Sequence, residues 1–361
     1  MPAARINVAE GLGYIALLPS LAAAVLFGAA APASKILLGN CDPLSLASLL
    51  YLGSGLGLAG WLMARKALTA ARRHTSALRG KDWFVMSGAV LAGGVAAPFL
   101  FMVALSLSPA STVSLILNLE MVFTAVLAWL LFREGFELRV ALGLAAVAGG
   151  CLVLSWPGAG IEGWGFGAPA AVAACLCWGL DNNLTQRLAD RDPIQIAALK
   201  GLVGGVVNGA LALALGKTFP SILPLSAALG VGLLGYGLSL VLFIVSLGRI
   251  GTARTMGVFA AAPFVGATLA FTVLGEPLSP SFAVGAIVVA VGLFLALTAH
   301  HAHQHTHPDA AHSHVHIHDD HHRHEHGPEV LGEEPHGHEH IHNPMEHAHP
   351  HYPDTHHRHD H

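Results

Sequence analysis

The sequence predicts an all-α membrane protein with ten transmembrane helices, arranged as two inverted five-helix repeats and followed by a disordered tail. Three observations predict this class: long apolar segments, basic residues confined to every second connection, and similar stretches in the two halves. Of the 361 residues, 53% are hydrophobic and only 11% are charged, whereas soluble domains carry about 25% charged residues. The composition therefore favours a membrane protein.

Apolar runs of about 18 residues or more are long enough to cross a bilayer as helices. Ten such runs follow one another with almost no amphipathic segment between them, which argues against the core of a soluble protein. The first run is too long for the apolar region of a signal peptide, so we expect it to be a spanning helix. The predicted spans are 14–38, 44–64, 83–105, 112–131, 138–156, 166–186, 194–216, 223–247, 252–274 and 278–298.

Lysine and arginine favour the cytoplasmic connections of membrane proteins. With the N-terminus inside, thirteen basic residues that precede the tail fall in cytoplasmic segments, and Lys217 falls outside. An even number of spans returns the C-terminus to the same side, so we expect both termini to be cytoplasmic. The thirteen residues are Arg5, Arg65, Lys66, Arg72, Arg73, Arg79, Lys81, Arg133, Arg139, Arg187, Arg191, Arg249 and Arg254.

Two stretches of the first half have partners, in the same order, in the second half. FGAAAPASKILLGNCDP (27–43) matches WGLDNNLTQRLADRDP (178–193), since each begins with an aromatic residue and glycine and ends with Asp-Pro. Residues 104–134 match 246–276, and each of these two stretches closes on a glutamate. These matches indicate an internal duplication.

The predicted repeats are 14–156 and 164–298, and residues 299–361 form the tail. Five spans are an odd number, so the second repeat must enter the membrane inverted relative to the first. Inverted repeats of this kind are typical of secondary transporters, whose substrate site lies near the membrane midplane between the halves.

These features give the chain a resemblance to the EamA-type permeases of the drug/metabolite transporter superfamily. The resemblance covers essentially all of 14–298. It rests on FG...PxxK near the end of the first span, SPAS before the fourth, a glutamate after the fourth and ninth, and AAPFVG in the ninth. LLYLGSGLGL, WGLDNNLT and a tail ending HPHYPDxHHRH resemble a bacterial subgroup with a histidine-rich tail.

The resemblance implies a ten-helix carrier in the bacterial inner membrane, in a family that exports many small metabolites. Many members carry an arginine early in the second helix, whereas Tyr51 stands in that region of this chain. A substrate role of that arginine therefore cannot be carried over.

Charged and amide side chains inside the spans are the candidates for a transport path, because charges within hydrocarbon are costly. Asp181 and Lys200 are equally far in sequence from the turn between the sixth and seventh spans, each about 14 Å along its helix. We expect them to form a buried ion pair that fixes the helix register, with a role in transport as the alternative. The candidates are Glu120, Asn118, Asn208, Lys35, Asp181, Asn182, Asn183 and Lys200.

Glu120 lies near the middle of the fourth span, with no basic residue obviously level with it. A carboxyl removed from water can bind and release a proton near neutral pH, as a proton-coupled carrier requires. The alternative is a neutral carboxyl hydrogen-bonded to Asn118 or to a backbone carbonyl. For Lys35, near the outer end of the first span, we expect either a side chain that reaches the membrane interface or a contact with an anionic substrate group.

Glycines four residues apart predict close packing between helices, and flexing between two states is the functional alternative. Pro98 and Pro263 fall inside the third and ninth spans, where they predict bends beside a cavity. The glycines are Gly53, Gly57, Gly201, Gly205 and Gly209.

The tail from His300 onward contains 24 of the 25 histidines and 11 of the 22 acidic residues. It has few large apolar residues, so we expect disorder. Histidines in HxH steps bind Zn, Ni, Co and Cu ions well, so we expect the tail to bind a divalent metal. The expected ligands are His312, His314, His316, His318, His321, His322, His324, His326, His347, His349, His351, His356, His357, His359 and His361.

Three roles of the tail stay open: it collects a metal for export, senses or buffers metal, or responds to pH. The spans contain few metal ligands, which argues against a metal as the transported solute. The sequence therefore predicts a secondary transporter that exports a small metabolite, with proton coupling as an option. The alternatives are a divalent-metal exporter for nickel, cobalt or zinc, and a membrane-anchored metal sensor or buffer.

No catalytic constellation is visible, so we expect neither enzyme activity nor a required cofactor. The expected partners are the lipid bilayer, a small-molecule substrate, divalent metal ions and a second copy in a homodimer. We expect no nucleic-acid partner.

Overall fold

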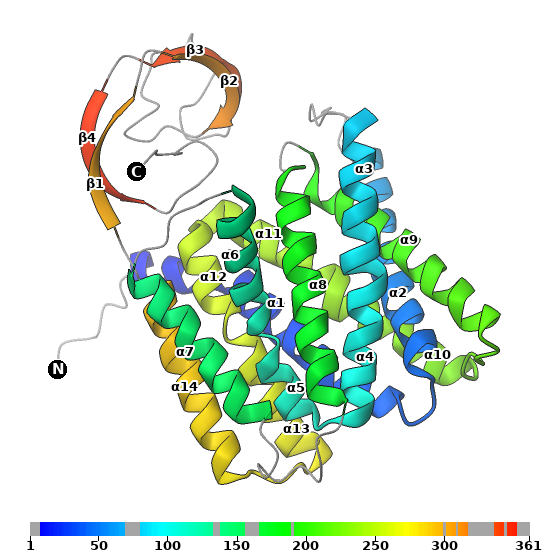
Figure 1. The fold of residues 1–361 in the computed structure, drawn as a ribbon. Coiled ribbons are helices and arrows are strands. Elements are labelled where there is room, and N and C mark those ends of the chain that lie inside the picture. The colour runs from blue at the N-terminus through cyan, green and yellow to red at the C-terminus, as the bar shows by residue number, and fades with distance from the viewer. Residues whose placement is uncertain are drawn as a thin grey trace, which may run out of the picture. The chain divides into compact units, whose positions relative to one another are not determined.

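The computed structural model describes residues 8–68, 80–132, 138–155, 166–188, 191–298, 301–307, 310–316, 336–342 and 345–351. The chain divides into two compact units, Met1–Thr298 and Ala299–His361. The described part of the first unit is helical, and the described part of the second consists of strands (Figure 1).

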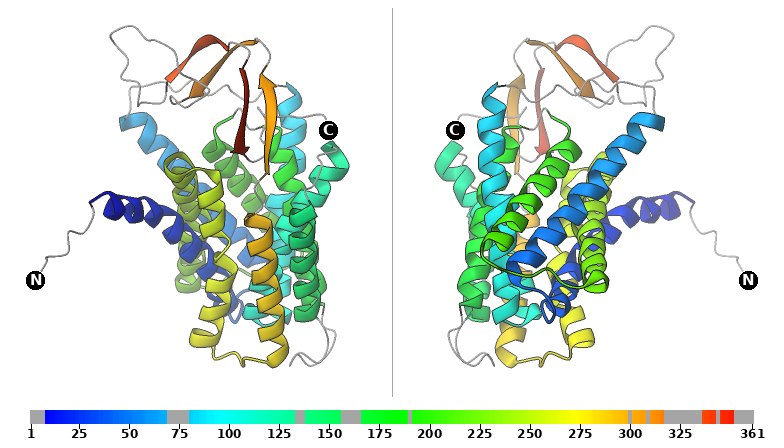
Figure 2. Two further views of the ribbon diagram at one scale, coloured as in Figure 1. Left: turned by 90° about the vertical axis from the view of Figure 1, so that its left-hand side faces the viewer. Right: turned by 90° about the vertical axis from the view of Figure 1, so that its right-hand side faces the viewer.

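Two series of helices build the first unit (Figures 1 and 2). The first series is α1 (Val8–Leu37), α2 (Pro43–Leu68), α3 (Gly80–Ala89), η1 (Val90–Ala96), α4 (Ala97–Leu107), α5 (Ala110–Ile116), α6 (Leu119–Phe132) and α7 (Leu138–Ser155). The second is α8 (Gly167–Gln186), α9 (Pro193–Ala214), α10 (Ile222–Val231), η2 (Gly232–Leu238), α11 (Ser239–Ile250), α12 (Thr252–Phe259), α13 (Ala262–Leu274) and α14 (Pro280–Leu297).

Among the described residues, nine helical segments are long and apolar enough to cross a membrane, as in a multi-pass membrane protein. Some of them join consecutive helices, as α3, η1 and α4 do in Gly80–Leu107. The predicted span 166–186 forms the helix α8 but is not one of the nine. Asp181 and its two neighbouring asparagines lower the hydropathy of this helix.

The helices of the first unit run between two ends (Figure 1). The end where α2 and α8 finish and α3 and α9 begin is the basic end, and the end with the turn 38–42 is the opposite end. The described residues at the basic end include Arg65, Lys81, Arg139, Arg187, Arg191, Arg249 and Arg254.

The antiparallel helices α2 and α9 pack closely against each other. A side chain at Gly201 of α9 would overlap the backbone of Gly55 in α2, because an added Cβ would lie 2.8 Å from its Cα. The helices α7 and α14 approach in the same way, with Gly143 against Gly292 and Gly150 against Gly285. The close packing predicted from the glycines is therefore confirmed.

An aspartate begins each helix of the α2–α9 pair and joins it to the other helix. Asp42 and Asp192 each accept a hydrogen bond from the backbone N–H two residues further on, at 3.0 and 2.9 Å, so each caps its helix. Asp192 also pairs with Arg65 of α2, and Asp42 pairs with Lys217, just beyond α9, at 3.0 Å. The pair is thus tied at both ends.

The segments η1 and η2 are π-helical, which is rare and often marks functional sites. The wider turn pairs the N–H of Ala97 with the carbonyl of Ala92, so carbonyls between them need other donors. The Tyr51 hydroxyl donates to the Gly93 carbonyl at 2.7 Å. Asn208, which is fully buried, donates to the next two carbonyls at 3.3 and 3.4 Å. Asn208 thus stabilises η1.

Pro98 and Pro263, which the sequence places inside two of the predicted spans, each follow an interruption of the α-helix. Pro98 comes directly after η1, at the second residue of α4, and Pro263 follows the turn between α12 and α13. Both lie where a missing N–H is tolerated, near the start of a new helical segment.

Four strands occur in the second unit: β1 (His301–His307), β2 (Ala310–His316), β3 (His336–His342) and β4 (Met345–His351). β1 pairs with β4 and β2 with β3, both antiparallel. The prediction of a disordered tail is wrong for these strands. Histidine at every second position has the two-residue period of a strand, and the register sets His312, His314 and His316 opposite other histidines.

Candidate functional site

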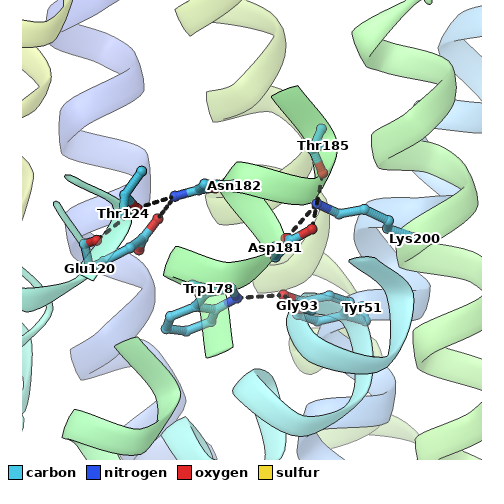
Figure 3. Close-up of polar contacts among 9 residues, drawn as sticks. All are labelled: Tyr51, Gly93, Glu120, Thr124, Trp178, Asp181, Asn182, Thr185 and Lys200. Atoms are coloured by element: carbon cyan, nitrogen blue, oxygen red, sulfur yellow. Dashed lines mark hydrogen bonds and ion pairs between the residues drawn. The ribbon is translucent and has the colours of Figure 1, made fainter. Parts of the chain in front are cut away.

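Elements of both series of helices line a cavity of about 220 Å³ in the first unit. Figure 3 shows the polar contacts of five of its lining residues, Tyr51, Glu120, Trp178, Asp181 and Lys200. The first series contributes α1, α2 and α6, and the second contributes α8, α9, η2 and α11. The lining residues are Phe27, Tyr51, Ser54, Glu120, Trp178, Asp181, Ala197, Lys200, Gly201, Tyr236 and Leu240.

Asp181 and Lys200 form the predicted ion pair between α8 and α9. Lys200 Nζ lies 2.5 Å from Asp181 Oδ2, and Thr185 Oγ1 donates to Asp181 Oδ1 at 3.0 Å. Asp181 is only 3% exposed, and Gly93 leaves room for it because any side chain there would overlap the carboxylate. The prediction of the pair is confirmed, and the two charges neutralise each other at the cavity wall.

Glu120 carries the cavity's unneutralised charge. Its Oε1 accepts a hydrogen bond of 2.9 Å from Asn182 Nδ2, which also donates to Thr124 Oγ1 at 3.1 Å. Within the described part of the chain, no basic side chain forms an ion pair with this carboxylate. The Asn118 amide, one of the two alternative partners of Glu120, donates instead to the Leu115 carbonyl at 2.8 Å.

A break in the fourth predicted span explains how Glu120 is placed. The helix α5 ends at Ile116, two turn residues follow, and α6 begins at Leu119. Glu120 therefore lies in the first turn of α6, where the positive end of the helix dipole favours a carboxylate.

Aromatic rings form much of the remaining wall. Trp178 Nε1 donates to the Tyr51 hydroxyl at 3.3 Å, and that hydroxyl donates to the Gly93 carbonyl, so both polar groups are used within the protein. The ring of Tyr236 lies 6.1 Å from that of Tyr51 and 6.0 Å from that of Phe27, centroid to centroid.

The sequence prediction did not include these rings among the site residues. A signal for two of them was present, because Phe27 and Trp178 are the aromatic residues that begin the first pair of matched stretches. For Tyr51 and Tyr236 only the fold brings the rings together.

Three of the rings also line a second, much smaller cavity. It measures about 10 Å³, and Phe27, Trp178 and Tyr236 line both cavities. Its other lining residues include Ser114 and Pro263, which lie nearer the opposite end. Of these two cavities, the one nearer the opposite end is therefore much the smaller.

Two charged side chains bind backbone groups at the opposite end. Lys35 donates to the carbonyls of Leu105 and Ser108 at the end of α4, the latter at 2.9 Å. Glu276 accepts hydrogen bonds of 2.6 and 2.9 Å from the first two N–H groups of α5. These contacts join α1 to α4 and the end of α13 to α5.

The remaining candidates have different positions. Asn183 joins α8 to α6 by donating to the carbonyls of Gly179 and Thr124 at 2.8 and 3.0 Å. Asn182 is exposed and lies one turn from Trp178 toward the basic end. Of the eight candidates, three line the cavity and a fourth bonds to one of them.

The tail ligands are only partly within the described structure. Among the side chains that are described, no three His, Cys, Asp or Glu residues gather in a way that could hold a metal. His312, His314 and His316 lie in β2, and His347, His349 and His351 lie in β4. The others lie outside the described residues: His318, His321, His322, His324, His326, His356, His357, His359 and His361.

Comparison with known proteins gives a family match to each half. The EamA-like transporter family matches residues 12–156 and again 165–298. An uncharacterized transporter of Methanothermobacter thermautotrophicus is 30% identical over 299 residues, which is 78% of this chain and 85% of that protein. A solved structure titled "Crystal structure of protein" has a TM-score of 0.56 at 22% identity, over 78% of this chain and 98% of its own, which supports the fold alone.

Proposed function

The chain belongs to the EamA-like transporter family, and on that premise we propose that it exports a small metabolite by alternating access through the cavity around Glu120. The family is a class of transporters and not of enzymes. The observation that carries the proposal is the cavity itself, which combines one unpaired carboxylate with walls from both halves of the chain. Transporters with inverted repeats place their substrate sites in this position.

We propose ten spans in two inverted repeats, 14–156 and 164–298, with α8 as the tenth span. Three observations support this arrangement. The family matches each half once, each half has a π-helical segment within its third span, and each has an aspartate that caps its second span. The helix α8 packs against α4 and α6, as a spanning helix would.

We propose that the basic end faces the cytoplasm, as the excess of lysine and arginine favours. Both termini would then be cytoplasmic, in the inner membrane of a bacterium. The exposed Asn182 and the contacts of Lys35 and Glu276 support a state that is open toward the basic end and closed at the opposite end.

Proton coupling is proposed for Glu120. Partial burial favours the protonated carboxyl, whereas the Asn182 amide and the positive end of the α6 helix dipole favour the carboxylate. A proton bound there would neutralise the cavity, and substrate would replace it in the exchange.

For the tail we propose divalent-metal binding by histidine in the cytoplasm. Its composition supports this role, as does the register that places histidines opposite histidines in both strand pairs. A metal exporter is the less favoured function, because the cavity contains neither histidine nor cysteine.

The test is a flux measurement with the full-length protein in proteoliposomes, beside a chain that ends at residue 299. A pH gradient should drive the flux of an organic solute in both forms, and nickel, cobalt and zinc should not cross in either. Metal flux that is lost only without the tail would instead support a metal exporter. No flux of any organic solute under a pH gradient would contradict the proposed function.

A further inference from the structure

The charges around the cavity add up to one negative charge when Glu120 is ionised. Lys200 is neutralised by Asp181 at 2.5 Å, and the remaining lining residues are uncharged. An anionic group of a substrate would therefore have to compete with Asp181 for Lys200. A cationic group meets a carboxylate that, among the described residues, has only the Asn182 amide as a partner.

The aromatic rings give a cation a second favourable surface. The indole N–H of Trp178 and the hydroxyl of Tyr51 are used in hydrogen bonds within the protein, so these two residues offer the cavity their rings. A cation over the face of Trp or Tyr is attracted by the negative face of the ring. Tyr236 lines the cavity as well, and its hydroxyl has no hydrogen bond within the described structure, which leaves it free to accept one from an ammonium group.

The volume limits the size of the substrate. An apolar cavity of about 150 Å³ holds a benzene molecule, and this cavity measures about 220 Å³. That is room for an amine with one small ring or a short apolar chain. The apolar part would lie between Phe27, Leu240 and the rings already named.

We propose that the cavity binds a small organic ammonium ion with a flat or apolar body, held between the Glu120 carboxylate and the rings of Trp178, Tyr51 and Tyr236. This inference rests on the proposed transport function and specifies its substrate class. Zwitterions such as amino acids are disfavoured, because the cavity offers no unpaired basic group for their carboxylate.

Equilibrium binding of labelled phenethylamine to the full-length protein in lipid nanodiscs tests the proposal. Unlabelled 2-phenylethanol, phenylacetate and phenylalanine compete as matched neutral, anionic and zwitterionic probes. Phenethylamine should bind at least about tenfold more tightly than each of them, because it alone gains a charge-assisted hydrogen bond without an unpaired carboxylate. Equal or tighter binding of any of the three would overturn the proposal.

Variants locate the site. Glu120→Gln should remove the preference for the amine over the alcohol. Trp178→Leu should weaken amine binding about tenfold, Trp178→Phe should weaken it less, and Trp83→Leu, at an exposed tryptophan outside the cavity, should not change it. An unchanged amine preference in Glu120→Gln would contradict the site.

Binding and transport fail in distinguishable ways. If the amine binds through Glu120 but no pH gradient drives its flux, the ammonium site stands and the carrier proposal fails. If a pH gradient drives the flux of other organic solutes while phenethylamine does not bind, the carrier proposal stands and the ammonium site fails.

Discussion

At the scale of single residues, Asp181 and Lys200 illustrate how charges are accommodated inside a helical bundle. The two residues meet because α8 and α9 extend from the same turn as antiparallel helices, and each charge would be costly alone. The sequence could predict this pair from spacing. It could not predict that Gly93 of another helix makes space for the carboxylate, which is a property of packing.

Removing one partner of this pair should destabilise the protein strongly. Asp181→Asn leaves the Lys200 ammonium half-buried without its counter-charge and should lower the free energy of unfolding by about 3 kcal/mol. The double change Asp181→Asn with Lys200→Met should recover most of that loss. Denaturant unfolding in detergent measures both variants, and a double variant no more stable than the single one would contradict a role confined to charge pairing.

Glu120 and its surroundings could be predicted less well. Its position in a span marked it as a candidate, but Asn118, which the sequence offered as an alternative partner, bonds instead to the Leu115 carbonyl of α5. The true partner, Asn182, is 62 residues away. Contacts of this range depend on how α6 and α8 pack, and spacing within one helix does not contain that information.

At the scale of elements, glycine contacts determine how closely the helices approach. Gly201 lies against Gly55 where α9 crosses α2, and the two π-helical segments lie beside this pair. The sequence indicated close packing through the four-residue spacing of its glycines. It did not indicate the π-helices, because a one-residue widening of a turn leaves no clear sequence pattern.

A pair of glycine variants in the same two helices separates packing from helix propensity. Gly201→Ala should destabilise the protein by about 1–3 kcal/mol, because the new methyl group would overlap the backbone of Gly55. Gly60→Ala, in α2, meets no atom within 4 Å and should be neutral or stabilising by up to about 1 kcal/mol. Thermal unfolding of both variants measures the difference, and equal stabilities would contradict the close approach of α2 and α9.

At the scale of the whole molecule, hydropathy alone was enough to predict a multi-pass helical protein, and nine of the ten predicted spans meet that criterion in the structure. The exception is α8. Its polar residues, among them Asp181 in the cavity wall, lower the mean hydropathy of this helix. In the tail, composition alone was not enough to predict the secondary structure. Its composition predicted disorder, whereas the alternation of histidine matches the period of the four strands.

The central claim is that Glu120 exchanges a proton for the substrate in a cavity whose other two charges, Asp181 and Lys200, neutralise each other. Besides that pair, the hydroxyl-bearing rings of Tyr51 and Tyr236 line the same cavity, and Asn182 bonds directly to Glu120. At low pH a protonated Glu120 must lose its proton when an ammonium ion binds. Proton release per bound amine should therefore increase, and amine affinity should decrease, as the pH falls.

The most direct measurement is proton release from weakly buffered full-length protein on addition of phenethylamine, between about pH 5 and pH 8, where the amine itself stays protonated. If Glu120 exchanges its proton for the amine, the release should approach one proton per bound amine at the acid end, decline as the pH rises, and be absent in Glu120→Gln. Equal release in Glu120→Gln, or amine binding without proton release at any pH in this range, would contradict this exchange.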